Sequence, residues 1–195
     1  KRNRVPYVFG MPGGGSSIDL IEACRSEKIP FVLAQHETTA AIMAIVCGEL
    51  TNSCGVCISI MGTGAINLAG GATYAFLERH PLICITETYD PMEASSMSLQ
   101  KIDHGATFAP YCKSIVTIGV DNPGEQIDQS IKLAMSERPG PIHVDLPRVA
   151  APGPDGSTPR GSLAGVSGDS GGVEGDLEAI ADAIDRAEKP VVVVG

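Results

Sequence analysis

Short apolar runs alternate with longer stretches of helical periodicity along most of the chain. The apolar runs are rich in β-branched residues and predict buried strands at residues 7–9, 31–34, 56–60, 82–86 and 141–145. The periodicity between them predicts helices at residues 18–26, 38–50, 65–77 and 126–137. Strands that alternate with helices favour right-handed βαβ units. The pattern therefore predicts an α/β fold with three layers, α-β-α, whose central parallel sheet is buried on both faces.

The pattern changes near Ala151. Residues 150–175 are mostly Gly, Ser, Pro and Asp, a composition typical of a flexible linker. Residues 176–188 then place apolar side chains at helical spacing, and residues 191–194 form a valine run. One helix and one strand cannot bury such an apolar face alone. We therefore expect a domain at residues 1–149 that is trimmed at its N-terminus, a linker at 150–175, and the beginning of a truncated second α/β domain at 176–195.

The chain is acidic, with a net charge of −9 and no basic cluster. This charge argues against a nucleic-acid partner and against binding to an anionic membrane surface. No apolar run approaches the length of a membrane span, and the apolar run behind the basic residues 1–4 is too short for a signal peptide. We therefore expect a cytoplasmic protein with neither nucleic-acid nor membrane partners.

Six cysteines are present, and three of them, Cys47, Cys57 and Cys84, lie in apolar runs. We interpret these three as buried free thiols of a reducing compartment. Cys54 and Cys57 form a C-x-x-C pair, but neither a second pair nor a histidine at metal-binding spacing accompanies it. The sequence therefore favours neither a metal site nor a redox site in this chain.

Other sequence motifs for chemistry are incomplete. Residues 62–64 (Gly-Thr-Gly) lie between a predicted strand and a predicted helix, as a dinucleotide-binding loop does, but Asn67 replaces the third glycine. The phosphate-binding G-K-[ST] and the zinc-binding H-E-x-x-H motifs do not occur. Ser16 and Ser17 follow a glycine loop and are better explained as helix caps than as nucleophiles.

Five short segments, taken together, carry more information than any of these motifs. They are residues 8–14 (VFGMPGG), 35–37 (QHE), 62–68 (GTGAINL), Gln100 and residues 138–147 (RPGPIHVDLP). In this order and spacing they resemble the N-terminal, pyrimidine-binding domain of thiamine-diphosphate enzymes of the acetolactate synthase and pyruvate oxidase type. The resemblance runs from about Val5 to Pro147. Residues 150–195 resemble the linker and the beginning of that family's central domain.

Glu37 stands where a predicted buried strand passes into a helix, with only His36 beside it as a potential cation. A buried carboxylate needs a partner. The resemblance implies that Glu37 shares a proton with N1′ of the cofactor's aminopyrimidine ring, which promotes the imino tautomer and removal of the thiazolium C2 proton. The resulting ylid attacks a 2-oxo acid, and the cofactor is the electron sink when carbon dioxide leaves. The alternative is a carboxylate that only stabilises a helix N-terminus.

The resemblance also implies roles for other residues. The expected cofactor-binding residues, besides Glu37, are Pro12, Gly13, Gly62, Thr63, Gly64 and Asn67. Gln100 matches a family glutamine near the reacting centre, and the alternative is an ordinary surface glutamine. His104 could move protons, but a surface or packing role is the simpler interpretation. The chain departs from the family pattern in having Thr63 for a proline, Leu99 for a phenylalanine and residues 46–48 (Val-Cys-Gly) where a Gly-Tyr is usual.

The resemblance therefore implies the pyrimidine-binding part of a thiamine-diphosphate-dependent 2-oxo acid decarboxylase or carboligase, most like acetolactate synthase. In that family a separate domain with a G-D-G…N motif holds the diphosphate and its Mg²⁺, and this chain has no G-D-G. The family site also forms between two subunits. We therefore expect a homodimer or tetramer, an inactive isolated fragment, a 2-oxo acid substrate, and FAD as a further cofactor that the full-length protein could bind. The alternative is a non-catalytic α/β module for subunit association.

Overall fold

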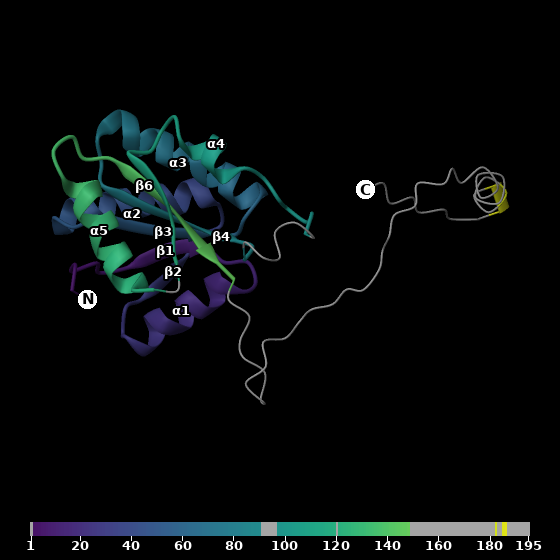
Figure 1. Ribbon diagram of the computed structural model, residues 1–195, viewed down its shortest axis with the longest axis horizontal. Coiled ribbons are helices and arrows are strands. Elements are labelled where there is room, and N and C mark those ends of the chain that lie inside the picture. Colours follow the sequence, from purple (N-terminus) through teal and green to yellow (C-terminus); the bar gives the residue numbers. More distant parts are fainter. Residues whose placement is uncertain (1, 91–96, 120, 149–181, 183–184, 187–195) are drawn as a thin grey trace. The chain divides into compact units, whose positions relative to one another are not determined.

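The computed structural model describes residues 2–90, 97–119, 121–148, 182, 185 and 186, and Figure 1 shows its strands and helices. The strands are β1 (Val8–Met11), β2 (Phe31–Leu33), β3 (Gly55–Ser59), β4 (Leu82–Thr88), β5 (Ser114–Thr117) and β6 (Pro141–Pro147). The helices are α1 (Ser16–Ser26), α2 (Glu37–Thr51), α3 (Thr63–Glu78), α4 (His104–Phe108) and α5 (Pro123–Met135). The predicted linker at 150–175 and nearly all of the predicted second domain at 176–195 lie outside the described residues, so both stay predictions.

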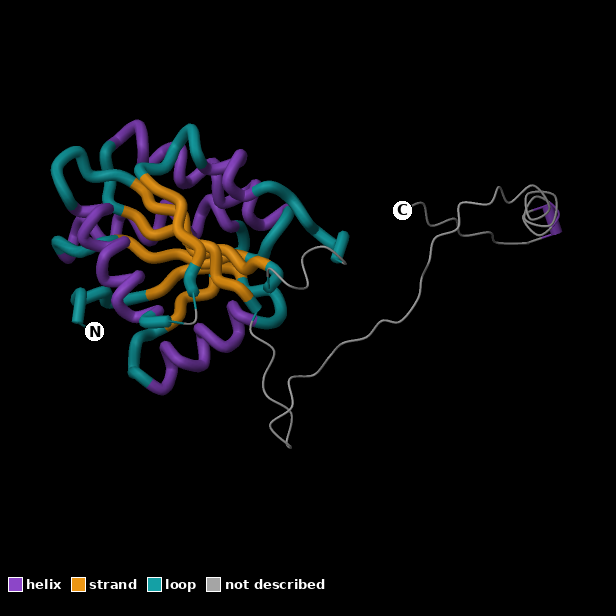
Figure 2. The backbone as a smooth tube through the Cα atoms, in the orientation of Figure 1, coloured by secondary structure: helices purple, strands orange, loops and turns teal. Residues whose placement is uncertain are grey.

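The strands form one 6-stranded sheet in the order β2-β1-β3-β4-β6-β5. Every neighbouring pair is parallel. Helices α2, α3 and α4 cover one face of the sheet, and α1 and α5 cover the other (Figure 1). Figure 2 shows the orange strands between the purple helices. The prediction of a three-layer α-β-α fold around a parallel sheet is confirmed.

Strand β4 shows how the sheet is buried on both faces. Leu82 and Cys84 belong to the core beneath α2, α3 and α4, whereas Ile83 and Ile85 belong to the core beneath α1 and α5. None of the four is more than 7% exposed. Complete burial of a side chain such as Leu82 contributes about 1.5–3 kcal/mol. Because successive strand residues point to opposite faces, the strand anchors both cores at once.

Small residues allow α2 and α3 to approach each other closely. A Cβ atom added to Gly71 would lie 2.2 Å from the Cβ of Ala41. Ala40, Ala44 and Ala72 are also completely buried in the same core. This close packing brings the first turns of the two helices together, which places the start of α2 beside residues of α3.

Two elements of the fold were not predicted from the sequence. Helix α4 has 5 residues and strand β5 has 4 residues, so neither is long enough to show a clear periodicity. Strand β5 is also an edge strand, with only partly buried side chains at its first three positions. A one-residue difference concerns α2, which begins at Glu37 rather than at Thr38.

The cysteines agree in large part with the prediction of buried free thiols. All six are free, and Cys57 and Cys84 are buried, although Cys47 is only half-buried. Burial, together with the nearby Cys84, raises the pKa of the Cys54 thiol to about 12. A thiol with such a pKa stays protonated at neutral pH and reacts slowly. The C-x-x-C pair therefore behaves as part of the core.

Candidate functional site

The predicted site residues meet at the carboxyl edge of the sheet. Pro12 and Gly13 follow β1, Glu37 begins α2 shortly after β2, and Gly62 follows β3. From β1 the chain passes to β2 on one side of the sheet and then to β3 on the other. A reversal of this kind is where parallel α/β sheets bind ligands, in the crevice beyond the carboxyl ends of the strands.

Glu37 is buried next to an amide and a glycine. It is the first residue of α2 and only 6% of it is exposed. The side-chain amide of Asn67 donates a hydrogen bond to its Oε2 over 3.0 Å. Its Oε1 faces Gly64, where an added Cβ would lie 3.0 Å away. Across the described part of the chain, Glu37 forms no ion pair. The fold thus buries a carboxylate, binds one of its oxygens, and packs the other against Gly64.

His36 does not neutralise this carboxylate. It is the N-cap residue of α2, and its Nδ1 accepts a hydrogen bond from the backbone N–H of Thr38 over 3.2 Å. The neighbouring imidazole is therefore committed to the helix backbone. The unpaired N–H groups in the first turn of α2 stabilise any negative charge on Glu37.

Three loops pack against one another around this position. An added Cβ on Gly13 would lie 2.4 Å from the Cδ1 of Ile60. Gly62 has a φ of +67°, and an added Cβ there would lie 2.6 Å from the Cβ of Gln100. Gln100 itself has a φ of +54° and is exposed. The structure thus brings the predicted Gln100 against the loop that begins α3, at the rim of the site.

The remaining predicted residues are at the same edge without a specific contact. Pro12 is half-buried after β1, and Thr63 is an exposed first residue of α3. Their predicted contact with a cofactor stays a prediction. Asn67, by contrast, is placed by its bond to Glu37.

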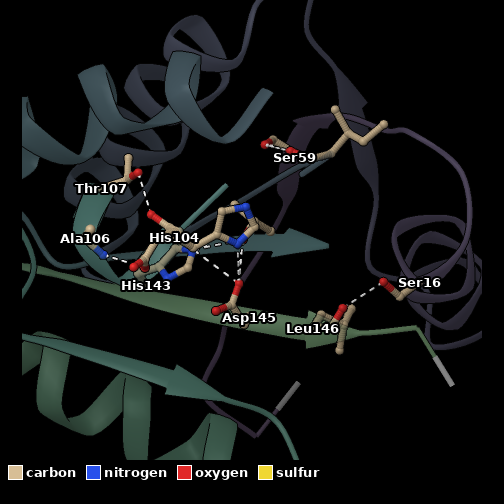
Figure 3. Close-up of polar contacts among 11 residues, drawn as sticks. Ser16, Ser59, His104, Ala106, Thr107, His143, Asp145 and Leu146 are labelled. Carbon is tan, nitrogen blue, oxygen red and sulfur yellow. Dashed lines mark hydrogen bonds and ion pairs between the residues drawn. The ribbon is translucent and has the colours of Figure 1, made fainter. Parts of the chain in front are cut away.

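A buried polar cluster lies farther along the same edge, and sequence reasoning found only one of its members. The Nδ1 of His104 lies 2.6 Å from the Oδ1 of Asp145. The Thr86 hydroxyl donates to the same oxygen over 3.1 Å and lies 2.8 Å from the Nε2 of His143. Figure 3 shows His104, His143 and Asp145 pointing toward one another. The sequence signal that could have revealed this cluster is the presence of polar residues in the buried strands β4 and β6, at positions whose side chains point into the core.

His143 lies at the bottom of this cluster and is neutral at neutral pH. Burial lowers its pKa to about 4; the nearby Asp145 acts in the opposite direction, and His104 adds to the decrease. The ring of Phe108, from α4, stacks on the His143 ring with centroids 4.0 Å apart. His143 is therefore sealed between the sheet and α4.

The cluster could be taken for a metal site. One donor atom from each of His104, His143 and Asp145 lies within 4.8 Å of the others, close enough to share one ion. The Thr86 hydroxyl, however, is within 3.3 Å of His104 Nδ1 as well as bonded to the other two residues. It links the three groups directly. We therefore describe a hydrogen-bonded cluster.

The start of α1 corrects one prediction. Ser16 and Ser17 do not cap this helix, because its N-cap residue is Gly15. Ser16 Oγ instead donates to the carbonyl of Leu146 over 2.9 Å (Figure 3), and Ser17 Oγ accepts from the backbone N–H of Gly13. The carboxylate of Glu87, only 3% exposed, accepts from the backbone N–H of Ser17 over 3.0 Å. A residue 70 positions away therefore caps the helix, which local sequence patterns cannot reveal.

The fold and the site together define a ligand-binding domain of the parallel α/β class, with a buried glutamate beside glycine loops. A sequence profile of the family "Thiamine pyrophosphate enzyme, N-terminal TPP binding domain" matches residues 1–107. The chain is 30% identical over 194 residues to the catabolic acetolactate synthase of Raoultella terrigena, and 31% identical over 195 residues to the acetolactate synthase of Bacillus subtilis. It is 31% identical over 145 residues to the large subunit of acetolactate synthase isozyme 2 of Escherichia coli. The chain belongs to the thiamine pyrophosphate enzyme family, which confirms the resemblance predicted from the motifs.

The matches differ in how much of each protein they cover. The Raoultella and Bacillus matches include 98% of this chain but 34% and 33% of the relatives. The Escherichia match includes 74% of this chain and 26% of the relative. The chain thus spans about a quarter to a third of the length of the curated relatives that it matches.

The residues present fit the pyrimidine end of thiamine diphosphate. The ring offers a nitrogen that can share a proton with a carboxyl group, and Glu37 is a buried carboxyl without an ion pair among the described residues. The missing side chain of Gly64 lets α3 approach Oε1 closely, because an added Cβ would lie only 3.0 Å from this oxygen. Among these residues, Glu37, Gly64 and Asn67 are the best placed to hold the ring.

Proposed function

We propose that this chain is the pyrimidine-binding part of a thiamine-diphosphate-dependent enzyme that decarboxylates 2-oxo acids or joins them, as acetolactate synthases do. The observation that carries the proposal is the burial of Glu37 at the carboxyl edge of the sheet, with an amide on one oxygen, Gly64 against the other and no ion pair among the described residues. Family membership supports the cofactor, and the acetolactate synthase relatives support the substrate class.

Glu37 has the central role in the proposed mechanism. Thiamine diphosphate, when bound, supplies the electron sink for the loss of carbon dioxide. With the cofactor bound, Oε1 of Glu37 would exchange a proton with a nitrogen of the pyrimidine ring. Asn67 fixes the carboxyl orientation by holding Oε2. Gln100, on the exposed rim, orients the substrate side of the site. Each of these residues acts by position, charge or proton transfer.

The proposal includes what the chain itself does not carry. The diphosphate and Mg²⁺ are held by another domain, the full-length protein could bind FAD as a further cofactor, and the isolated chain is inactive. The absence of a G-D-G sequence from the chain supports this division. The chain's match to only about one third of each acetolactate synthase relative supports it as well.

We further propose that the complete protein is a cytoplasmic homodimer or tetramer. Helices α2 and α3 leave large apolar side chains exposed, with Leu50 81% and Leu77 68% accessible. A groove of 470 Å³ beside α2 is lined by Tyr7, Val46 and Leu50 among others. Apolar surface of this kind favours association with a second subunit. The described helices are too short or too polar to cross a membrane, and the cysteines are free.

The test is Glu37→Gln in the full-length enzyme, with Glu49→Gln on the exposed side of the same helix as the matched control. The amide keeps the shape of Glu37 but cannot exchange a proton with the ring nitrogen. We expect turnover to fall about 10²- to 10⁴-fold, the usual range for a positioned acid or base, and hydrogen–deuterium exchange at cofactor C2 to slow equally. Glu49→Gln should leave both unchanged.

A second candidate function is a non-catalytic module for subunit association, which the exposed apolar surface of α2 and α3 favours. The same experiment separates the two. If Glu37→Gln folds, binds thiamine diphosphate and keeps full turnover and C2 exchange, the catalytic proposal is wrong and the association module is preferred.

A further inference from the structure

The segment that carries Gln100, residues 97–103, is attached to the domain at both of its ends. On the near side, the Tyr89 hydroxyl donates to the carbonyl of Leu99 over 2.7 Å. Gln100 lies against Gly62, as described above. On the far side the segment runs directly into α4, whose first residue is His104. The contacts that hold His104 in place therefore also limit the position of Gln100.

His104 is fixed to two central strands of the sheet. It is 6% exposed, and its Nδ1 lies 2.6 Å from Asp145 Oδ1 on β6. Thr86 on β4 is paired with Asp145 across the sheet and donates to the same carboxylate oxygen. Strands β4 and β6 are interior strands of the sheet, so these partners are rigid.

The protons of the cluster can be assigned from its geometry. A carboxylate only accepts, so His104 must carry its proton on Nδ1 to bond Asp145 at 2.6 Å. The hydroxyl of Thr86 donates to Asp145, so it accepts from His143, which must carry its proton on Nε2. The other nitrogens, His104 Nε2 and His143 Nδ1, are buried without a hydrogen-bond partner. In this assignment each of these two nitrogens carries no proton, and its lone pair accepts no hydrogen bond.

The alternative assignments leave buried N–H groups unpaired. If Thr86 donated to His143 instead, the proton of His143 would move to its unpartnered Nδ1. A metal ion bound by both imidazoles would place protons on both unpartnered nitrogens. A buried donor or acceptor without a partner costs about 1–3 kcal/mol. The same two nitrogens lack a partner in every assignment, but only the chain from His143 through Thr86 to Asp145, with His104 on the opposite side, gives each of the three short contacts one donor and one acceptor.

We propose that His104, held by Asp145 and Thr86, is a positioning residue that fixes the Gln100 segment at the rim of the site. Its contribution is the Nδ1–H bond to Asp145, and its Nε2 takes no part in proton transfer. The inference rests on the proposed function only in so far as Gln100 orients the substrate.

The first test needs no cofactor and uses the 195-residue chain. Long-range ¹H–¹⁵N spectra of its histidines should show His104 with the proton on Nδ1 and His143 with the proton on Nε2. Addition of Zn²⁺ at micromolar concentration should leave both signals in place. A His104 protonated on Nε2, or signals displaced by Zn²⁺, would overturn the proton assignment.

The second test uses two variants that separate the ring nitrogens. The amide nitrogen of Asn occupies the position of histidine Nδ1, and that of Gln the position of Nε2. His104→Asn can therefore keep the bond to Asp145, whereas His104→Gln cannot. In the chain without cofactor, amide hydrogen exchange over residues 97–103 should be near wild type for Asn and at least tenfold faster for Gln. His80→Gln, at the opposite edge of the sheet, is the control.

In the full-length enzyme the two His104 variants should differ in the same direction. We expect kcat/KM within about threefold of wild type for His104→Asn and about 10- to 100-fold lower for His104→Gln, because small displacements of a positioned group cost that much. Equal losses in both variants would assign the effect to Nε2 or to packing and overturn the proposal, as would no loss in either.

Thr86 supplies a second matched pair if His104→Gln does not fold. Thr86→Ser keeps the hydroxyl, whereas Thr86→Val keeps the shape without it. Only the Val variant should speed exchange over residues 97–103. These exchange measurements stand even if Glu37→Gln proves silent, so failure of the proposed function and failure of this inference can be told apart.

Discussion

Glu37 and Glu87 are two buried glutamates at the same edge of the sheet, and each lies near the N-terminus of a helix. They are 6% and 3% exposed, respectively. Glu87 accepts a backbone N–H from the first turn of α1, whose own N-cap residue, Gly15, has no side chain to do so. Among the described residues, Glu37 accepts a hydrogen bond from the side chain of Asn67 alone, and its own helix is capped by His36.

This difference teaches that burial alone does not mark a functional carboxylate. Every helix leaves N–H groups unpaired in its first turn, so the bond from Ser17 accounts for Glu87 within the fold. Glu37 meets no such need, and its Oε1 lies against Gly64. A buried acid whose partner is not required by the fold is the better candidate for a ligand contact.

Among the further tests of this comparison, Gly64→Ala in the full-length enzyme has the largest expected effect. The added Cβ would lie 3.0 Å from Glu37 Oε1 and 2.6 Å from a side-chain carbon of Ile60, so the carboxyl group proposed to meet the cofactor ring must move. We expect kcat/KM to fall about 100-fold through displacement of the reacting groups. Gly124→Ala, also at the second position of a helix but with nothing within 4 Å of the added Cβ, should change it less than twofold. Full activity of Gly64→Ala would show that turnover does not depend on the position of the Glu37 carboxyl group.

A smaller effect is expected on the free energy of unfolding at acid pH. Its measurement separates the contribution of His143 from that of the two glutamates. The pKa of His143 is lowered from 6.5 to about 4 in the folded chain, so the unfolded chain binds the proton first as pH falls. The contribution of His143 to the free energy of unfolding is therefore complete above pH 6.5 and decreases toward pH 4. The expected decrease is about 2 kcal/mol between pH 7 and pH 5. Urea unfolding of the chain at the two pH values measures the change.

The control for the acid experiment is His143→Gln, which has no titrating ring. Its free energy of unfolding should lack the 2 kcal/mol decrease, and whatever pH dependence persists then belongs to other groups, the two glutamates included. An unaltered decrease in the variant would contradict the assignment to His143.

The smallest effect belongs to Glu87→Gln. The amide oxygen can still accept from Ser17, so only the attraction between a negative charge and the helix N-terminus is lost. We expect the free energy of unfolding to decrease by about 0.3–1 kcal/mol and turnover of the full-length enzyme to stay unchanged. Urea midpoints and steady-state kinetics, run beside Glu37→Gln, measure both. A loss of turnover as large as that of Glu37→Gln would erase the distinction between the two carboxylates.

Much of the fold could be read from local patterns. Runs such as residues 82–86 and the periodicity of residues 38–50 predicted strands and helices that the structure contains. The alternation of the two predicted a parallel sheet, and a parallel sheet gathers the ends of its strands at one edge. The position of Glu37 at a strand–helix junction followed from the same reading. Helix α4 and strand β5 were not predicted, because a few residues carry too little periodicity.

The sequence by itself therefore determined the order of the longer elements, the parallel sheet, and the position of Glu37 at its carboxyl edge, because spacing along the chain sets the direction in which side chains point. The tertiary structure alone decided what those residues touch. Asn67 meets Glu37 across 30 residues, His104 meets Asp145 across 41, and Glu87 meets Ser17 across 70. Contacts of this range depend on how helices dock on the sheet, so the partners that distinguish a capping carboxylate from a candidate ligand-binding one become visible only in the folded chain.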